Sequence, residues 1–236
     1  MQNLEKEIEL RNKIELLNIQ ENAPDVFYVF IGLGNSIESK INYYNYQLNK
    51  TLVSGGFKNL EIDPEKTEDF LNGNIIYAPF VPNKTTFNSP TSHMMGVING
   101  YQVEYILEYH RPKTYPSRFS CIYAFGDYES CVKANKLYPN MFDMSKIKKF
   151  KLKKINNDLD RCIKIVKCNM EIVTRMWNCG ITTFLPESIE TIANAYWSSC
   201  GQVATERQNI ETGRYIQKIS DVLYEYLIEG ILEEIE

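Results

Sequence analysis

The chain of 236 residues is long enough for one large domain or two small ones, and its 44% hydrophobic content is sufficient for a buried core. Its 26 basic and 30 acidic side chains nearly balance, giving a formal net charge of −4. That charge argues against a protein that coats nucleic acid, because such domains are normally basic.

Cysteine and histidine usage gives little material for a metal site. The only histidines are His93 and His110, and the six cysteines form no CxxC pair. We therefore expect no metal site, and reduced thiols in a cytosolic protein. The opening MQNLEKEIEL is charged and no run of about 18 apolar residues follows, so we predict neither a signal peptide nor a membrane span.

An amphipathic helix is predicted over residues 2–19. Apolar residues recur there at helical spacing as far as Leu17, between charged residues, and Pro24 ends the pattern. We interpret residues 1–22 as an N-terminal helical arm and residues 23–236 as one domain.

A buried strand is predicted over residues 25–33, because DVFYVFIGL is apolar, β-branched and aromatic. Two glycines then mark a turn, and Asn35 or Ser36 can cap a helix that runs to about Leu48. The GLGN segment lacks the third glycine of a dinucleotide-binding fingerprint, so a Rossmann fold is not expected.

Residues 54–100 are rich in Gly, Pro, Asn, Ser and Thr, and one short helix is predicted after Asp63-Pro64. Such a long irregular stretch is usually a functional loop or a mobile one. Two strands are predicted next, over residues 101–110 and 119–125, and a helix over residues 126–138.

A lysine-rich strand is predicted over residues 146–154 (KIKKFKLKK), with Phe150 and Leu152 facing inward and lysines outward. Two interpretations stay open. The lysines could protect a solvated edge strand against pairing with other chains, or they could form a patch that faces phosphate.

The C-terminal third predicts two helices and a strand. Residues 157–178 carry an apolar stripe at helical spacing, and a second helix is predicted over residues 186–197. Residues 198–217 are polar. Residues 222–228 (VLYEYLI) predict a strand, although a helix over residues 216–235 fits the spacing nearly as well.

A compact polar cluster lies between the strands predicted at 101–110 and 119–125, and it consists of Arg111, Pro116, Ser117, Arg118 and Ser120. The α+β and α/β folds tend to place ligand-binding groups at strand ends. Arg118 could bind a diphosphate through bidentate hydrogen bonds from its guanidinium, or it could form a structural ion pair. The serines could bond a carboxamide or ribose, or cap a turn. His110 could be a general base, or a histidine satisfied within its loop.

Glu225 stands among apolar neighbours in the strand predicted over residues 222–228. An unpaired buried carboxylate is costly, so a glutamate in the middle of a strand tends to have a partner or a role. If the segment is a helix, Glu225 is an ordinary exposed glutamate.

Several of these segments occur in a familiar order. They are PSRFSCIYAF, a helix, the lysine-rich strand, RCIKIVKCNMEIV, AYW and YEYLIEG. In this order the chain resembles, over roughly residues 55–236, a family of uncharacterised bacterial and phage domains related to the ADP-ribosyltransferase fold. The resemblance implies an α+β fold in which two small sheets form a cleft for NAD.

The resemblance also implies roles for particular residues. The late-strand glutamate of the family matches Glu225, which would be catalytic because a fixed carboxylate stabilises the oxocarbenium-like charge that develops as nicotinamide leaves. The hydroxyl-bearing strand matches residues 117–123, so that Ser117, Arg118 and Ser120 would bind NAD. The first motif of the family carries Arg or His, but the first strand here offers Tyr28. This departure could mean a changed chemistry, a first motif supplied by Arg111, or an inactive relative.

Two functions of different class follow. The chain could use NAD to transfer ADP-ribose to a protein or nucleic-acid acceptor, in a conflict of phage and host or of toxin type. Alternatively, it could be a binding protein of the same fold without turnover, which inhibits or remodels a host complex. A third interpretation is a nucleic-acid-binding domain that uses the lysine strip of residues 146–154 with nearby tyrosines.

Overall fold

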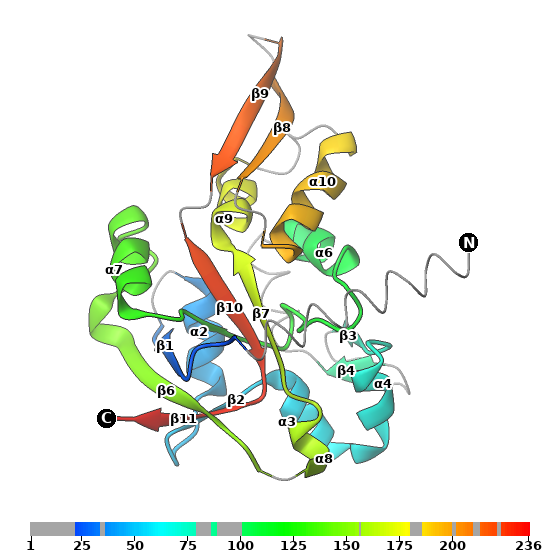
Figure 1. The fold of residues 1–236 in the computed structure, drawn as a ribbon, viewed down its shortest axis with the longest axis vertical. Helices are drawn as coiled ribbons and strands as arrows, with labels where there is room; N and C mark the ends of the chain where they lie inside the picture. The colour runs from blue at the N-terminus through cyan, green and yellow to red at the C-terminus, as the bar shows by residue number, and fades with distance from the viewer. Residues whose placement is uncertain are drawn as a thin grey trace.

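The computed structural model describes residues 22–33, 36–78, 86–88, 101–155, 157–179, 186–199, 202–209, 213–220 and 223–236. It combines helices with two antiparallel sheets (Figure 1), so the predicted α+β class is confirmed. The helix predicted over residues 2–19 lies outside the described residues. Among the helices that are described, none is both long enough and apolar enough to cross a bilayer.

The larger sheet has four strands in the order β1-β6-β11-β2, and the smaller has three in the order β5-β10-β7, all paired antiparallel. Two pairs stand apart, β3 with β4 (parallel) and β8 with β9 (antiparallel). The strands are β1 Val26–Phe30, β2 Thr51–Val53, β3 Ile76–Ala78, β4 Thr86–Asn88, β5 Ile122–Ala124, β6 Ile147–Lys153, β7 Lys164–Asn169, β8 Gln202–Asn209, β9 Gly213–Ser220, β10 Tyr224–Glu229 and β11 Ile231–Ile235.

Helices lie between most of these strands along the chain. The α-helices are α2 Ile37–Asn45, α3 Gly55–Ile62, α4 Thr67–Leu71, α6 Tyr101–Tyr109, α7 Tyr128–Leu137, α8 Asn157–Asp160, α9 Met170–Cys179 and α10 Pro186–Trp197. Two short 3-10 helices are η1 Pro64–Lys66 and η2 Met144–Lys146.

The last two strands connect the two sheets. Only Gly230 separates β10, the central strand of the small sheet, from β11, an inner strand of the large sheet. The β10–β11 corner therefore fixes how the sheets meet.

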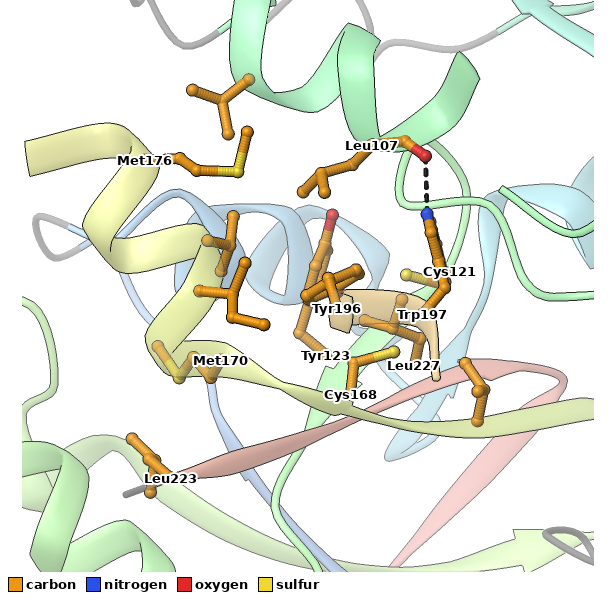
Figure 2. Close-up of a cluster of buried hydrophobic side chains, with 14 of the residues drawn as sticks. Leu107, Cys121, Tyr123, Cys168, Met170, Met176, Tyr196, Trp197, Leu223 and Leu227 are labelled. Carbon is orange, nitrogen blue, oxygen red and sulfur yellow. Dashed lines mark hydrogen bonds between the residues drawn. The ribbon is translucent and has the colours of Figure 1, made fainter. Parts of the chain in front are cut away.

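The small sheet packs against an apolar layer on each of its two faces. Toward the large sheet, alternate residues of both sheets form a buried cluster that includes Phe27, Leu52, Ile122, Phe150, Ile228 and Leu232. On its other face, the small sheet packs against α6, α9 and α10 through the side chains drawn in Figure 2, among them Leu107, Tyr123, Cys168, Met176, Tyr196 and Leu227. Along β10, Leu227 consequently faces the helices and Ile228 the other sheet.

Several predicted elements are confirmed close to their expected bounds. They are β1, α2, α7, β6, α10 and β10, which correspond to the predictions at residues 25–33, 36–48, 126–138, 146–154, 186–197 and 222–228. Ser36 caps α2 as expected, since its hydroxyl accepts a hydrogen bond from the Ser39 amide at 3.2 Å. The helical alternative for residues 216–235 is wrong.

The strand predicted at residues 101–110 is wrong, because this segment forms helix α6. Val103 and Leu107, one helical turn apart, are buried, whereas Tyr105 and Tyr109 are exposed. The β-branched and aromatic residues that suggested a strand thus follow a helical period against the helical layer.

The long helix predicted at residues 157–178 is also wrong. The chain forms a single turn, α8, then strand β7, and only then helix α9. Nearly every residue of β7 is buried, and a short apolar run of this kind cannot be distinguished from a buried helix by its spacing.

Two further predictions need correction, and one polar segment with no predicted element forms strands. The lysine-rich strand β6 is not an edge strand, because it lies between β1 and β11. The stretch predicted as irregular, residues 54–100, contains α3 and β3 in addition to the predicted short helix. The polar segment 198–217 contains β8 and the first part of β9, which pair as a hairpin.

Candidate functional site

The Arg118 side chain is the centre of a buried charged cluster. It comes from the loop between α6 and β5 and is 0% exposed. Its Nε and Nη2 donate to the two oxygens of Glu104 on α6, at 2.5 and 3.0 Å, while Nη1 donates to Glu225 Oε1 at 2.6 Å. Nη1 also donates to the Tyr196 hydroxyl. All three guanidinium nitrogens therefore have protein partners, two of them on a bidentate carboxylate.

Aromatic rings cover the Arg118 guanidinium. Its central carbon lies 4.9 Å from the centre of the Tyr123 ring and 5.3 Å from that of Tyr196. The Tyr123 hydroxyl in turn donates to the Arg118 carbonyl at 2.5 Å. Cation–π contacts of this kind are strongest where water is excluded, as it is here.

Two donors hold one oxygen of the Glu225 carboxylate. Its Oε1 accepts hydrogen bonds from Arg118 and, at 2.7 Å, from the Tyr196 hydroxyl. The residue is 2% exposed. Burial raises the pKa of Glu225 above its ordinary value, and the nearby Arg118 charge only partly offsets this.

Tyr196, the hydroxyl partner of Arg118 and Glu225, lies on helix α10. Its last turn carries Tyr196 and Trp197, and the Trp197 indole donates to the Leu107 carbonyl at 2.7 Å (dashed line in Figure 2). This bond ties α10 to α6, the helix that carries Glu104. The packing of two helices thus sets the positions of two Arg118 partners.

A pocket, here called the Glu225 pocket, opens beside this cluster. Two carboxylates, Glu38 and Glu225, share its lining with the aromatic rings of Phe30, Tyr123, Phe125 and Phe142. Its volume is about 10 Å³, which is room for roughly one water molecule. Glu38 Oε1 also lies 3.8 Å from Arg118 Nη2, so three carboxylates surround one guanidinium.

A larger surface groove of about 440 Å³ adjoins this pocket. Ser39 on α2 lines both, and Ile31 and Met141 in the groove directly neighbour Phe30 and Phe142 in the pocket. The groove is also lined by Gly32, Leu33, Tyr43, Asp143 and Lys146. Residues at the end of β1 and the start of α2 therefore line both the groove and the Glu225 pocket.

A second polar cluster surrounds Glu229, four residues further along β10. The Ser120 hydroxyl donates to Glu229 Oε1. Glu229 lines a small cavity together with Lys164, Arg111, Tyr77 and Ser117. In a strand, residues 225, 227 and 229 face the same side, so one face of β10 carries both buried glutamates.

The predicted site residues are divided among these features. Arg118 and Glu225 are in direct contact in the interior. Ser117 does not join them, because its hydroxyl donates to Glu108 at 2.8 Å. Arg111 binds the same Glu108 at 2.9 Å and the Tyr115 carbonyl at 2.7 Å, which makes it part of the loop.

Tyr28 lies apart from both clusters. It pairs through its backbone with Phe125, and its ring packs against Tyr128 at 5.9 Å between centres. Arg118 forms ion pairs, the second of its two interpretations from sequence, and it does not line the Glu225 pocket.

Several residues of the site had no clear signal in the sequence. Glu104 carries no signal because its segment predicts a strand, and Tyr196, in the helix predicted over residues 186–197, indicates only core or the wall of a pocket. Glu229 could have been found, since the alternation in YEYLIEG places it on the same face as Glu225. Lys164 could not have been found in this way, because it is the cross-strand partner of Glu229 on β7, a strand whose residues were predicted as part of a helix.

Comparison with known proteins adds no relative: no protein-family model matches the chain, and no curated protein is similar to it. Within the described residues, no group of three or more His, Cys, Asp or Glu side chains is placed to hold a metal ion.

Proposed function

We propose that the chain transfers ADP-ribose from NAD to a protein or nucleic-acid acceptor, with Glu225 as the catalytic carboxylate. The observation that carries the proposal is the placement of Glu225. Arg118 and Tyr196 hold its Oε1, while the side chain lines a pocket that adjoins the surface groove. A carboxylate fixed in this way, away from bulk water, suits the stabilisation of a developing positive charge.

The lining of the Glu225 pocket is compatible with the nicotinamide end of NAD. That ring is flat and cationic, and the pocket combines aromatic side chains with two carboxylates. The groove has the size of an ordinary small-molecule site, and Lys146 on its wall could meet a phosphate. Because the pocket holds only about 10 Å³, binding requires aromatic side chains such as Phe142 to move.

In the proposed reaction, Glu225 is the one residue of the site with a role in the chemical step. The glycosidic C–N bond breaks, its electron pair leaves with nicotinamide, and an acceptor nucleophile attacks the sugar carbon and loses its proton. Glu225 stabilises the cationic sugar between these events. Arg118 does not touch NAD in this scheme. Arg118 is instead a positioning residue that holds Glu225. This role replaces the one expected from the sequence, in which Arg118 binds the diphosphate of NAD.

A non-catalytic binding protein is the second candidate. The complete pairing of Arg118 and the small volume of the Glu225 pocket favour it, because neither leaves an open cleft beside Glu225. In that case the groove would bind part of a host complex and NAD would not be consumed.

Release of nicotinamide from NAD distinguishes the two candidates. The purified chain is incubated with NAD, alone and with a bacterial lysate as the source of acceptor, and nicotinamide and labelled acceptor are measured. Turnover by the wild type that is lost in Glu225→Gln supports the transferase. The absence of turnover together with no heat of NAD binding in calorimetry would exclude it in favour of the binding protein.

A further inference from the structure

Glu229 and Lys164 form a buried pair of opposite charge at the end of the small sheet. They are direct cross-strand partners on β10 and β7. Glu229 is 0% exposed and Lys164 6% exposed. The ion pairs found among the described residues do not include this pair, and Lys164 Nζ instead donates to the Phe70 carbonyl at 2.7 Å. A carboxyl group and an amine are thus buried together without a direct bond.

The pair lies where three segments meet. Glu229 directly precedes Gly230, the corner between β10 and β11. Ser54, which caps α3, accepts a hydrogen bond from the Gly230 amide at 3.1 Å. The Gly55 amide at the start of α3 donates to the Ser120 carbonyl at 2.6 Å, and the Ser120 hydroxyl donates to Glu229. Glu229 therefore connects α3, the loop before β5 and the β10–β11 corner.

The Glu229 carboxylate is incompletely satisfied. Its Oε2 has no hydrogen-bond partner among the described residues. Burial raises the pKa of Glu229 to about 7, although the hydroxyls of Ser120 and Ser54 act in the opposite direction. Burial also lowers the pKa of Lys164 to about 8. In the described part of the chain, the titratable and charged groups that act on Glu229 are Tyr77, Arg111, Cys121 and Lys164.

We propose that Glu229 and Lys164 make the β10–β11 corner a pH-sensitive joint, which is closed in weakly acidic solution and opens locally when Glu229 becomes charged. The ionised form places a negative charge in a site where one carboxylate oxygen lacks a donor. Local opening at the corner gives that oxygen access to water. The movement would loosen the start of α3 together with the β10–β11 turn.

The direction of the effect follows from linkage. A carboxyl whose pKa is raised on folding weakens the fold as pH rises from its unfolded value, 4.5, to its folded value, about 7. Above about pH 7 the weakening is complete. For a difference of this size, the equilibrium constant for opening is expected to rise about three-hundredfold across that interval. Lys164 acts in the opposite sense only above about pH 8, where it loses its proton in the folded chain.

Amide hydrogen exchange tests the joint. Exchange of residues 55–62 and 226–232 is measured at pH 6 and pH 8 and corrected for the intrinsic pH dependence of exchange. We expect lower protection at pH 8 in the wild type and equal protection at both pH values in Glu229→Gln, which is uncharged throughout. Glu61→Gln on the exposed side of α3 is the matched control and should behave as the wild type.

Two further measurements decide whether Glu229 is the group responsible. The side-chain carboxyl of Glu229, followed by carbon NMR, should titrate near pH 7, and Lys164→Met should move that midpoint upward because the cation is lost. If Glu229→Gln does not fold, Ser120→Ala replaces it and should also move the midpoint upward. A midpoint near 4.5, or the same pH dependence in wild type and Glu229→Gln, would overturn the proposal.

Discussion

Arg118 and Glu225 are 107 positions apart in sequence, yet Arg118 Nη1 lies 2.6 Å from Glu225 Oε1 in the interior. The contact connects the loop before β5 to the central strand of the small sheet. Glu104 and Tyr196 extend it to α6 and α10. Burial takes both charged groups out of water, so the net contribution of the contact depends on every protein partner being present.

Arg118→Met should destabilise the fold strongly, because it leaves Glu104 and Glu225 buried without their cation. We expect a loss of about 3–5 kcal/mol in the free energy of unfolding, measured by urea denaturation. Arg161→Met is the matched control, since Arg161 pairs with Glu68 at 3.4 Å on the surface and should cost about 1 kcal/mol or less. Equal losses in the two variants would show that the buried cluster is not a special source of stability.

Ser54→Ala should cost more than an ordinary helix cap. The Ser54 hydroxyl accepts from the Phe57 amide at 3.3 Å, within α3, and from the Gly230 amide at 3.1 Å at the β10–β11 corner. Loss of a cap alone costs about 1 kcal/mol, so the buried second bond should raise the total to about 2 kcal/mol. Asp127→Ala, which removes the exposed cap of α7, is the comparison and should cost about 1 kcal/mol by thermal or urea unfolding. Similar losses in both would mean that the Gly230 contact adds nothing.

The sequence was informative where local patterning and tertiary packing agree. The strand β10 was predicted with Glu225 inside it, and the cost of burying an unpaired carboxylate correctly implied a partner. The same pattern could not name Glu104 as a further member of the cluster. That residue comes within reach of Arg118 only because residues 101–109 form a helix, and α10 packs against it through Trp197 and Leu107.

The failures have a physical origin in burial. Residues 164–169 are buried on both faces of β7, so they lack the alternation that identifies a half-exposed strand. Residues 101–109 combine aromatic and β-branched residues with a helical burial period that only the packing reveals. The central position of β6 likewise depends on β11, a strand that the sequence patterns did not predict.

Glu225→Gln should reduce NAD turnover about a hundredfold if Glu225 is the catalytic carboxylate, because the change removes the charge and nearly preserves shape. Tyr196→Phe should reduce turnover about tenfold, since Glu225 loses one of the two donors that fix Oε1. Nicotinamide release measures both. The Tyr196 hydroxyl also lowers the pKa of Glu225, so its removal should shift the acidic limb of the pH–rate profile to higher pH. An unshifted profile with reduced turnover would indicate only a structural role for Tyr196.

Gly56→Ala should destabilise the chain although alanine normally favours a helix by up to about 1 kcal/mol over glycine. A Cβ at Gly56 in the first turn of α3 would lie 2.5 Å from Glu229 Oε2 and 2.9 Å from the Phe70 ring. Both neighbours are buried, so neither can move freely, and we expect a net loss of about 1–3 kcal/mol, as for other overpacked sites. The double variant Gly56→Ala with Glu229→Ala removes the nearer obstacle and should recover part of that loss relative to Glu229→Ala alone. Urea unfolding of the four proteins gives the coupling energy between the two positions, and a coupling near zero would mean that α3 and the Glu229 carboxylate are not in close contact.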